Sequence, residues 1–450
     1  NRELPKVPDY GWCEEHGVHN CPLHHPDVAQ LKTPATISQE DFERAARALS
    51  NFDRPANNSA CKVYQRRIQF ASDQAVKQAG VDVEIVDRRR VVDAIDGNGE
   101  ISYDQTRTAN LAPRAGGALW HVSKSVGDRV KAGEILAIVD TIVVGEAKSQ
   151  LLDALVQENL QQRTMQRLRS LGEAVAGRQV LEAESEFEKA HVAVLKAQQT
   201  FANLGIPVEL EKLRALPNEG KVASLRYHGL ENTFSPSQLA QVTTANLLPV
   251  YAPMDGLIVS RNVVAGEVVD TSTTLFQVAD VSRMWLTLSI PLESIGKVAI
   301  GQTVQFRPDG TQQVLTGPLQ WISTGADKQT RMVEVRAELD NSQGELRDET
   351  FGSGQIILRE EPQSIVVLDS AVHWEGCCHV VFVRDKNYFK SPDSFKVFHV
   401  CSVRLGAKKH GFTEIIAGVL PGEVVATVGS DVLSAQLLKN NLGAGCTCVE

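Results

Sequence analysis

Residues 144–204 form a long helical stretch, and this stretch restricts the fold of the 450-residue chain more than any other part of the sequence. Apolar residues recur in it at alternating steps of three and four, the spacing that keeps one side of a helix against a partner helix. Glu158 and Gln161 occupy two of these seam positions and interrupt the pattern. The apolar seam residues are Val144, Ala147, Leu151, Ala154, Met165 and Leu168, followed by Val180, Ala183, Phe187, Ala190, Val194, Ala197, Phe201 and Leu204. The pattern predicts two helices packed along one seam.

Two glycines and two copies of one motif indicate how this helix pair is placed in the chain. Gly172 and Gly177 lie between the two sets of seam residues and can end one helix and reverse the chain, which predicts an antiparallel pair. The flanking segments 112–140 and 252–280 have the same length and plan. Each begins Ala-Pro-x-x-Gly, continues as an apolar strand, turns at a glycine followed by an acid, and ends with an apolar strand and Asp. One copy has too few strands to bury its own face, so we expect both copies to form one small sandwich. This favours an inserted hairpin over a core helix pair of a globular domain.

This arrangement resembles the split biotinyl/lipoyl-like domain of membrane fusion proteins, the periplasmic adaptor subunits of tripartite efflux pumps. The resemblance covers the chain from about Val81 to Gln436. It implies a mainly β, elongated multidomain chain with an α-helical hairpin. The implied parts are an N-terminal Cys/His-rich segment at 1–62, a membrane-proximal β domain at 81–97 and 361–440, a β-barrel at 98–110 and 284–360, a split lipoyl-like domain at 111–140 and 250–281, the hairpin at 144–204, and a connecting segment at 205–249.

The strand pattern outside the repeat agrees with this plan. Trp285–Ile290 and Met332–Leu339 alternate apolar and polar residues, as the strands of a barrel or sandwich do. Residues 96–99, Asp-Gly-Asn-Gly, predict a turn between two scaffold strands. The run Ile300–Val304 and the pair Thr330-Arg331 are similar to the barrel signature of the adaptor family.

A cluster of metal-binding residue types lies near the start of the chain. It has the pattern C-x2-H-x4-C-x2-H and consists of Cys13, His16, Cys21 and His24. Two turns that each present a sulfur and an imidazole could close a tetrahedral shell around Zn(II) or hold another soft ion. The alternative is a Cys13–Cys21 disulfide with solvated histidines, His19 and His25 among them. The cluster resembles the small segments attached to metal-efflux adaptors. We therefore expect a bound Zn or other heavy-metal ion at this segment. We expect no cofactor that the protein requires.

The other cysteines are too few and too scattered for a disulfide framework in a chain of this length. They are Cys61, Cys377, Cys378, Cys401, Cys446 and Cys448. Cys377 and Cys378 are adjacent at an expected hairpin turn. A vicinal pair can be redox-active or bind a soft metal, but we expect two simple thiols here.

Charge and missing motifs exclude several function classes. The net charge of -9 argues against a nucleic-acid-binding surface. The sequence contains no run of 18 apolar residues that could cross a bilayer. It also lacks the GxSxG, GxxxxGK[ST], HExxH and dinucleotide-binding patterns, so we expect a scaffold or conduit rather than an enzyme. Because the first residue is Asn rather than Met, we expect that an N-terminal signal or anchor has been removed.

The resemblance to the adaptor family implies a function in export across a Gram-negative-type cell envelope. It implies a periplasmic protein associated with the inner membrane, docked on a proton-driven resistance-nodulation-division (RND) transporter and reaching an outer-membrane channel. Copies would self-associate as a hexamer or a trimer of dimers. The expected cargo is a metal cation, and the chain's four methionines favour Zn(II), Co(II) or Cd(II) over Cu(I) or Ag(I). Arg167 and Leu171 lie where the family's hairpin tip contacts the channel, and Gly177 stands where the family often has Ser.

Two alternatives belong to other classes of protein. The first is a biotin or lipoyl carrier component of an acyl- or carboxyl-transfer enzyme, in which Lys148 after the first repeat would hold the prosthetic group. Lys148 falls inside a predicted helix, and a long insertion separates the two halves, which argues against this alternative. The second is a stand-alone periplasmic metal-binding protein without pump partners.

Overall fold

The computed structural model describes residues 8–50, 56–171, 176–230, 244–391 and 394–438. The chain divides into two compact units. The first comprises residues 1–100, 287–337 and 351–450, and the second comprises residues 101–286 and 338–350. In sequence, the second unit is therefore inserted into the first.

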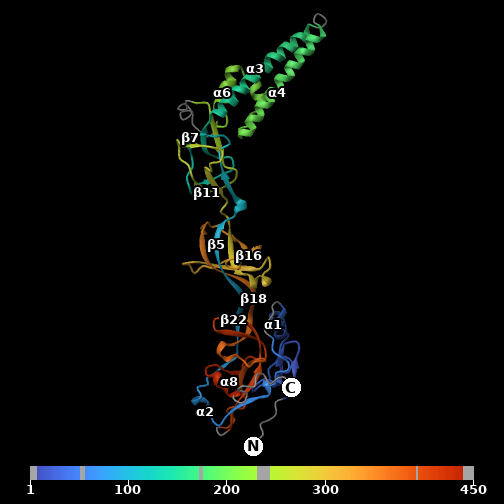
Figure 1. Ribbon diagram of the computed structural model, residues 1–450, viewed down its shortest axis with the longest axis vertical. Helices are drawn as coiled ribbons and strands as arrows, with labels where there is room; N and C mark the ends of the chain where they lie inside the picture. Colours follow the sequence, from blue (N-terminus) through green and yellow to red (C-terminus); the bar gives the residue numbers. More distant parts are fainter. Residues whose placement is uncertain (1–7, 51–55, 172–175, 231–243, 392–393, 439–450) are drawn as a thin grey trace. The chain divides into compact units, whose positions relative to one another are not determined.

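In the second unit, strands from both repeats form a sandwich of two four-stranded sheets (Figure 1). The first sheet has the order β10–β9–β7–β12, and the second has the order β6–β13–β11–β8. The strands are β6 (Thr108–Leu111), β7 (Gly117–Val122), β8 (Arg129–Val130), β9 (Ile135–Asp140), β10 (Leu247–Tyr251), β11 (Gly256–Arg261), β12 (Val268–Val269) and β13 (Phe276–Ala279). Each sheet takes strands from both halves of the repeat, so the predicted split sandwich is confirmed.

The turn glycines of the two repeats hold the halves together reciprocally. The Gly127 N–H donates to the Ile258 carbonyl oxygen at 2.9 Å, and the Gly266 N–H donates to the Leu119 carbonyl oxygen at 2.7 Å. Gly127 and Gly266 have φ values of 93° and 91°, a region that residues with a Cβ rarely adopt. The Gly-acid turn of each copy is therefore bonded to the first strand of the other copy.

The antiparallel hairpin predicted by the seam consists of α3 (Ile142–Ser170) and α4 (Gly177–Leu204), which lie side by side (Figure 1). All the apolar seam residues are buried or half-buried. Val144, Leu151 and Phe201, near the base of the hairpin, belong to the same apolar core as the sandwich strands. Two short helices, α5 (Leu210–Ala215) and α6 (Asn218–Arg226), follow the hairpin.

The polar seam residue Glu158 is buried and forms an ion pair with a partly exposed arginine. Its carboxylate accepts hydrogen bonds from Arg214 Nη2 at 2.7 Å and Nε at 3.1 Å, and it lies 2.7 Å from His191 Nδ1. His191 lies on the opposite arm and Arg214 lies on α5. The interruption of the apolar seam thus joins three helices.

The first unit contains most of an eight-stranded sheet with the order β15–β16–β17–β14–β5–β18–β23–β22. Because β15 also pairs with β18, the first six strands in this order close into a barrel. The strands are β5 (Asp87–Tyr103), β14 (Arg283–Pro291), β15 (Thr303–Pro308), β16 (Leu315–Ala326), β17 (Met332–Asp340), β18 (Thr350–Leu368), β22 (Arg404–Lys409) and β23 (Phe412–Ala417). The alternating segments of the sequence lie in β14 and β17, as predicted.

The turn predicted at residues 96–99 is wrong, because β5 continues through this segment. A Cβ atom on Gly97 would lie 2.6 Å from the carbonyl oxygen of Ser289 on β14, closer than a carbon atom can approach. Gly97 therefore allows two strands of the barrel to pass close to each other, a role of glycine that local sequence does not distinguish from a turn.

The rest of the first unit is built on a six-stranded sheet with the order β3–β21–β20–β24–β4, in which β19 also pairs with β20. The strands are β3 (Arg67–Phe70), β4 (Val83–Ile85), β19 (His373–Trp374), β20 (His379–Arg384), β21 (Lys396–Ser402) and β24 (Val424–Ala426). The N-terminal segment packs against strands of both sheets. The His19 N–H donates to Ser402 Oγ on β21 at 2.8 Å, and α1 (Gln39–Ser50) packs against β23 of the eight-stranded sheet. The N-terminal segment is thus part of this unit.

The expectation of two simple thiols at Cys377 and Cys378 is wrong. Both side chains are buried, and the sulfur of Cys61 lies in contact with both of theirs. The sequence separation of 316 residues between Cys61 and Cys377 explains why a local pattern does not reveal the cluster.

Candidate metal centre

Two turns of the same kind present the four predicted ligands. β1 (Trp12–Cys13) pairs with β2 (Val18–His19), and the Gly17 N–H donates to the Cys13 carbonyl oxygen at 2.9 Å, which closes the turn that carries His16. The His25 N–H donates to the Cys21 carbonyl oxygen at 2.9 Å and closes the turn that carries His24. Each C-x2-H half of the pattern therefore forms one turn, and the two turns face each other.

The donor atoms lie at the distances that a tetrahedral ion requires. Cys13 Sγ is 3.6 Å from His16 Nδ1 and 3.4 Å from His24 Nδ1, and Cys21 Sγ is 3.6 Å from His16 Nδ1. Around a tetrahedral Zn(II) with bonds of about 2.3 Å to sulfur and about 2.0 Å to nitrogen, neighbouring sulfur and nitrogen atoms lie about 3.5 Å apart. All four donor atoms lie within 4.8 Å of one another. The donor set and its geometry fit one Zn(II)-like ion.

The centre is buried on one side and open on the other. His16 is 2% exposed and Cys21 is 1% exposed, whereas the His24 side chain is exposed. Phe42 on α1 packs against the rings of both histidines. Cys21 also belongs to an apolar core shared with Ile416 of β23. An ion can therefore reach the centre from the His24 side, while the opposite side is fixed by the fold.

The surroundings favour a neutral ring at His16 and disfavour an uncompensated thiolate at Cys21. Burial lowers the pKa of His16, which keeps its ring neutral and able to bind a cation. Burial raises the pKa of the Cys21 thiol to about 12, and a metal ion would compensate the charge of the buried thiolate. Glu15 Oε2 lies 3.1 Å from His24 Nε2, so the proton of that ring is drawn to Nε2 and the Nδ1 lone pair faces the sulfur atoms.

Two neighbouring histidines lie outside this centre. His19 Nε2 lies 2.8 Å from the Ser59 carbonyl oxygen, and its ring stacks on Tyr64. His25 stacks on Tyr10 with ring centroids 3.8 Å apart. Neither Cys13 nor Cys21 is disulfide-bonded in the structure. The sequence did not single out Glu15 and Phe42; the position of an acid directly before His16 was the available signal for Glu15.

The predicted tip residues lie at the far end of the hairpin from its base. Arg167 is exposed in the last turn of α3, Leu171 caps this helix with 51% of its surface exposed, and Gly177 begins α4. Residues 172–175 between them lie outside the described residues. Below the tip, Arg169 on α3 donates to Glu184 on α4 at 2.7 Å and joins the two arms.

The environment of Lys148 argues against a carrier lysine. Its side chain is 6% exposed, and its Nζ donates to the carbonyl oxygens of Arg226 and Ala245 at 3.1 and 2.6 Å. Burial lowers the pKa of this amine to about 8. A lysine that carries biotin or lipoate has to extend into solvent. The buried side chain of Lys148 does not meet this requirement.

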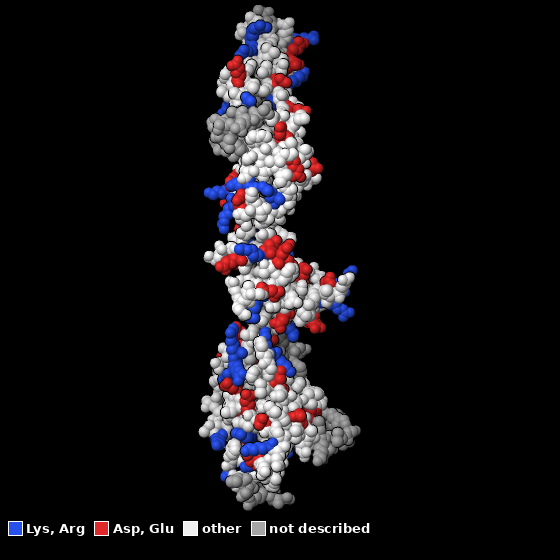
Figure 2. Space-filling view, turned by 90° about the vertical axis from the view of Figure 1, so that its left-hand side faces the viewer, with Lys and Arg blue, Asp and Glu red and all other residues white. Residues whose placement is uncertain are grey.

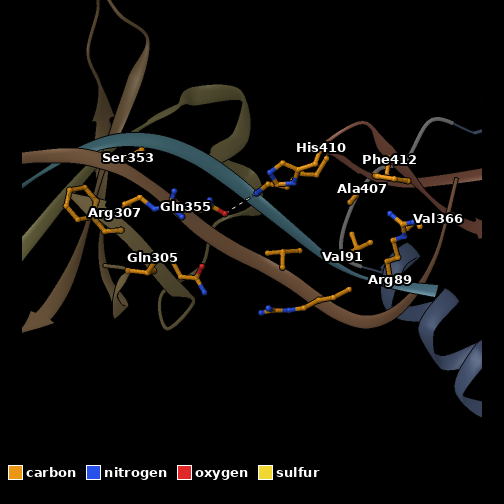
Figure 3. Close-up of a pocket in the computed structure, with 15 residues that line it drawn as sticks. Arg89, Val91, Gln305, Arg307, Ser353, Gln355, Val366, Ala407, His410 and Phe412 are labelled. Atoms are coloured by element: carbon orange, nitrogen blue, oxygen red, sulfur yellow. Dashed lines mark hydrogen bonds between the residues drawn. The ribbon is translucent and has the colours of Figure 1, made fainter. Parts of the chain in front are cut away.

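A cleft of about 510 Å³ lies in the first unit among β5, β15, β18, β22 and β23 (Figure 3). Its cationic lining residues are Arg89, Arg90, Arg307 and Lys409. The Arg89 guanidinium lies 4.3 Å from the centre of the Phe412 ring, and Lys409 Nζ donates to Gln355 Oε1 at 3.0 Å. Among the described residues that line the cleft there is no carboxylate, so its charge disfavours metal cations.

The surface of the described residues carries side chains of both charges (Figure 2). On the face shown in Figure 2, basic and acidic side chains are intermixed, whereas a nucleic-acid-binding surface is usually a continuous basic patch. In the part of the chain that the structure describes, no helix has the length and apolar character needed to cross a membrane.

The sequence is similar to proteins of metal-resistance systems. Residues 107–280 match the family model described as a CzcB-like barrel-sandwich hybrid domain, and residues 283–359 match that of a CusB-like beta-barrel domain. The cobalt-zinc-cadmium resistance protein CzcB of Cupriavidus metallidurans is 25% identical over 379 residues, which cover 84% of this chain and 65% of that protein. The nickel-cobalt-cadmium resistance protein NccB of Alcaligenes xylosoxydans xylosoxydans is 23% identical over 74% of this chain and 73% of its own length.

The solved structure of ZneB from Cupriavidus metallidurans is 23% identical, with a TM-score of 0.37, over 80% of this chain and 95% of that chain. The chain spans 65% of the length of CzcB, slightly less than two thirds. The two family matches adjoin and together cover the sandwich, the inserted hairpin and most of the barrel, which is more than half of the chain. The chain therefore belongs to the CzcB-like membrane fusion proteins.

Proposed function

We propose that this protein is a periplasmic adaptor that links an inner-membrane RND transporter to an outer-membrane channel for the efflux of divalent metal cations. The observation that carries this proposal is the hairpin of α3 and α4, inserted between the halves of the sandwich. Its base is fixed in the sandwich core, and Arg167 and Leu171 at its other end are exposed. An arm anchored at one end and exposed at the other suits a connection between two partners.

We assign the tip residues Arg167, Leu171 and Gly177 to the contact with the channel, and the free flanks of the hairpin to contacts between copies. Apolar side chains are exposed along both helices outside the seam. They are Val156 and Leu160 on α3, and Leu181, Val192 and Leu195 on α4. Because large apolar side chains on an exposed flank favour association, they support the side-by-side assembly of six copies that the family resemblance implies.

The charge balance of the N-terminal centre supports a divalent ion. Two thiolates and two neutral imidazoles carry a charge of -2, so a divalent cation gives a neutral complex in a site that is buried on one side, whereas Cu(I) leaves a net negative charge. The relative named for resistance to cobalt, zinc and cadmium agrees with this preference. We therefore assign Cys13, His16, Cys21 and His24 as ligands of Zn(II), Co(II) or Cd(II).

The export function is tested by shortening the hairpin. Residues 156–191 are replaced by a short Gly-Ser linker in the native host, and tolerance of zinc, cobalt and cadmium is measured. Loss of tolerance is expected, because the arm no longer reaches its partner. Metal binding by the purified variant should be unchanged, because the N-terminal centre lies in the other unit. Full tolerance in the presence of the shortened arm would contradict the adaptor function and favour a stand-alone metal-binding protein.

The metal centre is tested by titrating the whole chain with Co(II) under reducing conditions. His16→Ala should weaken Co(II) binding at least about tenfold. Loss of a group that only hydrogen-bonds to a metal ligand already lowers metal affinity by about tenfold or more, and loss of the ligand itself should cost at least as much. His25→Ala is the matched control, because this neighbouring ring stacks on Tyr10 outside the centre. Equal affinities of the His16→Ala, Cys13→Ser and unmodified chains would refute the assignment.

A further inference from the structure

Three buried sulfur atoms form a second cluster in the first unit. Cys61 belongs to the N-terminal segment, whereas Cys377 and Cys378 lie in the connection between β19 and β20. Cys61 and Cys378 are 0% exposed and Cys377 is 4% exposed. The Sγ atoms of Cys377 and Cys378 are 3.9 Å apart, and all three Sγ atoms lie within 4.8 Å of one another.

The backbone holds the two segments of this thiol cluster together. The Asn58 N–H donates to the Cys377 carbonyl oxygen at 2.8 Å, and the Cys61 N–H donates to the Asn58 carbonyl oxygen at 3.0 Å. Asn57 Oδ1 accepts from the His379 N–H at 2.9 Å on the other side of the vicinal pair. Two segments that are far apart in sequence are therefore fixed at the position where the three thiols meet.

A disulfide bond cannot satisfy the whole cluster. The Cys61 sulfur is in bonding contact with the sulfurs of both Cys377 and Cys378, but a cysteine sulfur forms only one sulfur–sulfur bond. Any disulfide would leave the third thiol in an apolar core that includes Val76, Phe382 and Leu433. A three-coordinate ion uses all three sulfurs. With metal–sulfur bonds of about 2.3 Å, a trigonal arrangement places the sulfurs about 4.0 Å apart, close to the observed separation of Cys377 and Cys378.

We propose that Cys61, Cys377 and Cys378 bind one thiophilic divalent cation as a buried trithiolate, a second metal site distinct from the N-terminal centre. Binding releases three thiol protons and forms three metal–sulfur bonds without any change of oxidation state. The complex carries a charge of -1 with a divalent ion and -2 with a monovalent ion, and the apolar core favours the smaller charge. The site does not depend on the adaptor function.

The test uses the whole chain with Cys13, Cys21, Cys446 and Cys448 replaced by Ser, so that the N-terminal centre and the C-terminal thiols do not contribute. The fully reduced protein is titrated with Cd(II), and the thiolate-to-cadmium charge-transfer absorption in the ultraviolet is followed. We expect one Cd(II) per chain with three sulfur ligands. Absence of such binding in this reduced chain would overturn the proposal.

Single substitutions in this background identify the ligands. Cys61→Ala and Cys378→Ala should each weaken cadmium binding at least about tenfold, by comparison with the effect of removing an outer-shell group. Cys401→Ala is the matched control, because Cys401 is a half-buried thiol on β21 that lies outside the cluster. Circular dichroism identifies any variant that fails to fold, and the other substitution then decides. If Cys401→Ala weakens binding as much as a folded cluster variant does, or if the folded cluster variants bind normally, the assignment is wrong.

Discussion

The ion pair between Glu158 and Arg214 allows a quantitative test of how the hairpin is held. Glu158 is 7% exposed and accepts two hydrogen bonds from the Arg214 guanidinium, which is itself 31% exposed. Charge-assisted hydrogen bonds contribute about 1.5–3 kcal/mol each when they are buried. Because water can still reach the guanidinium, we discount this contribution and expect a coupling of about 1.5 kcal/mol for the pair. This corresponds to a change of about tenfold in an equilibrium constant.

The coupling is measured by a double-mutant cycle with Glu158→Gln and Arg214→Gln. Hydrogen exchange of the backbone amides in α3 and α5 reports the local opening free energy, since the pair joins these two helices. Each single variant should accelerate exchange by about tenfold, and the double variant should be little faster than either. Arg178 and Glu182 on α4 form the matched control pair, because both side chains are mostly exposed. Additive effects at Glu158 and Arg214, as expected for the exposed pair, would refute the view that the polar seam position stabilises the helical arm.

Two further predictions concern buried side chains of the two units. Phe201→Ala should destabilise the base of the hairpin by about 3–5 kcal/mol, because the side chain is fully buried. Leu195→Ala on the exposed flank is the control and should have little effect. Both are measured by urea unfolding followed by hydrogen exchange. Burial opposes ionisation of Glu414, but the Arg359 guanidinium, Ser364 Oγ and the Ala407 N–H outweigh it and lower the pKa of this carboxyl below its ordinary value of 4.5. The ion pair of Glu414 and Arg359 should therefore stabilise the protein above about pH 4.5 and lose this contribution as the pH falls through the lowered pKa of Glu414. Glu414→Gln should lower the urea midpoint at about pH 7 much more than at about pH 3. A pH-independent effect of Glu414→Gln would contradict this prediction.

The parts of the fold that sequence predicted are those specified by local repetition. The seam of α3 and α4 and the two motifs on either side of it each lie within a window of about 30 residues, so periodicity and turn glycines were sufficient to identify them. The sequence could bring the four candidate N-terminal ligands together for the same reason, since they fall within 13–24 and each Cys–His half folds into its own turn. Gly97 shows the limit of this reasoning. Position 97 requires glycine because the carbonyl oxygen of Ser289 leaves no space for a Cβ atom. A contact between two strands so far apart in sequence leaves no local signal.

The two sulfur-containing centres differ in their access to solvent, and this difference predicts different rates of exchange with metal in solution. In the N-terminal centre His24 is exposed, so an incoming ion can bind this ring before it displaces the buried Cys21 proton. All three sulfurs of Cys61, Cys377 and Cys378 are enclosed by the fold, so an ion has to wait for a local opening of the surrounding core. Metal bound to the thiol cluster should therefore exchange more slowly than metal bound at the N-terminal centre. A structural ion needs only the slow rate, whereas a centre that takes up cargo needs the fast rate, which is why we assign cargo binding to the N-terminal centre and not to the thiol cluster.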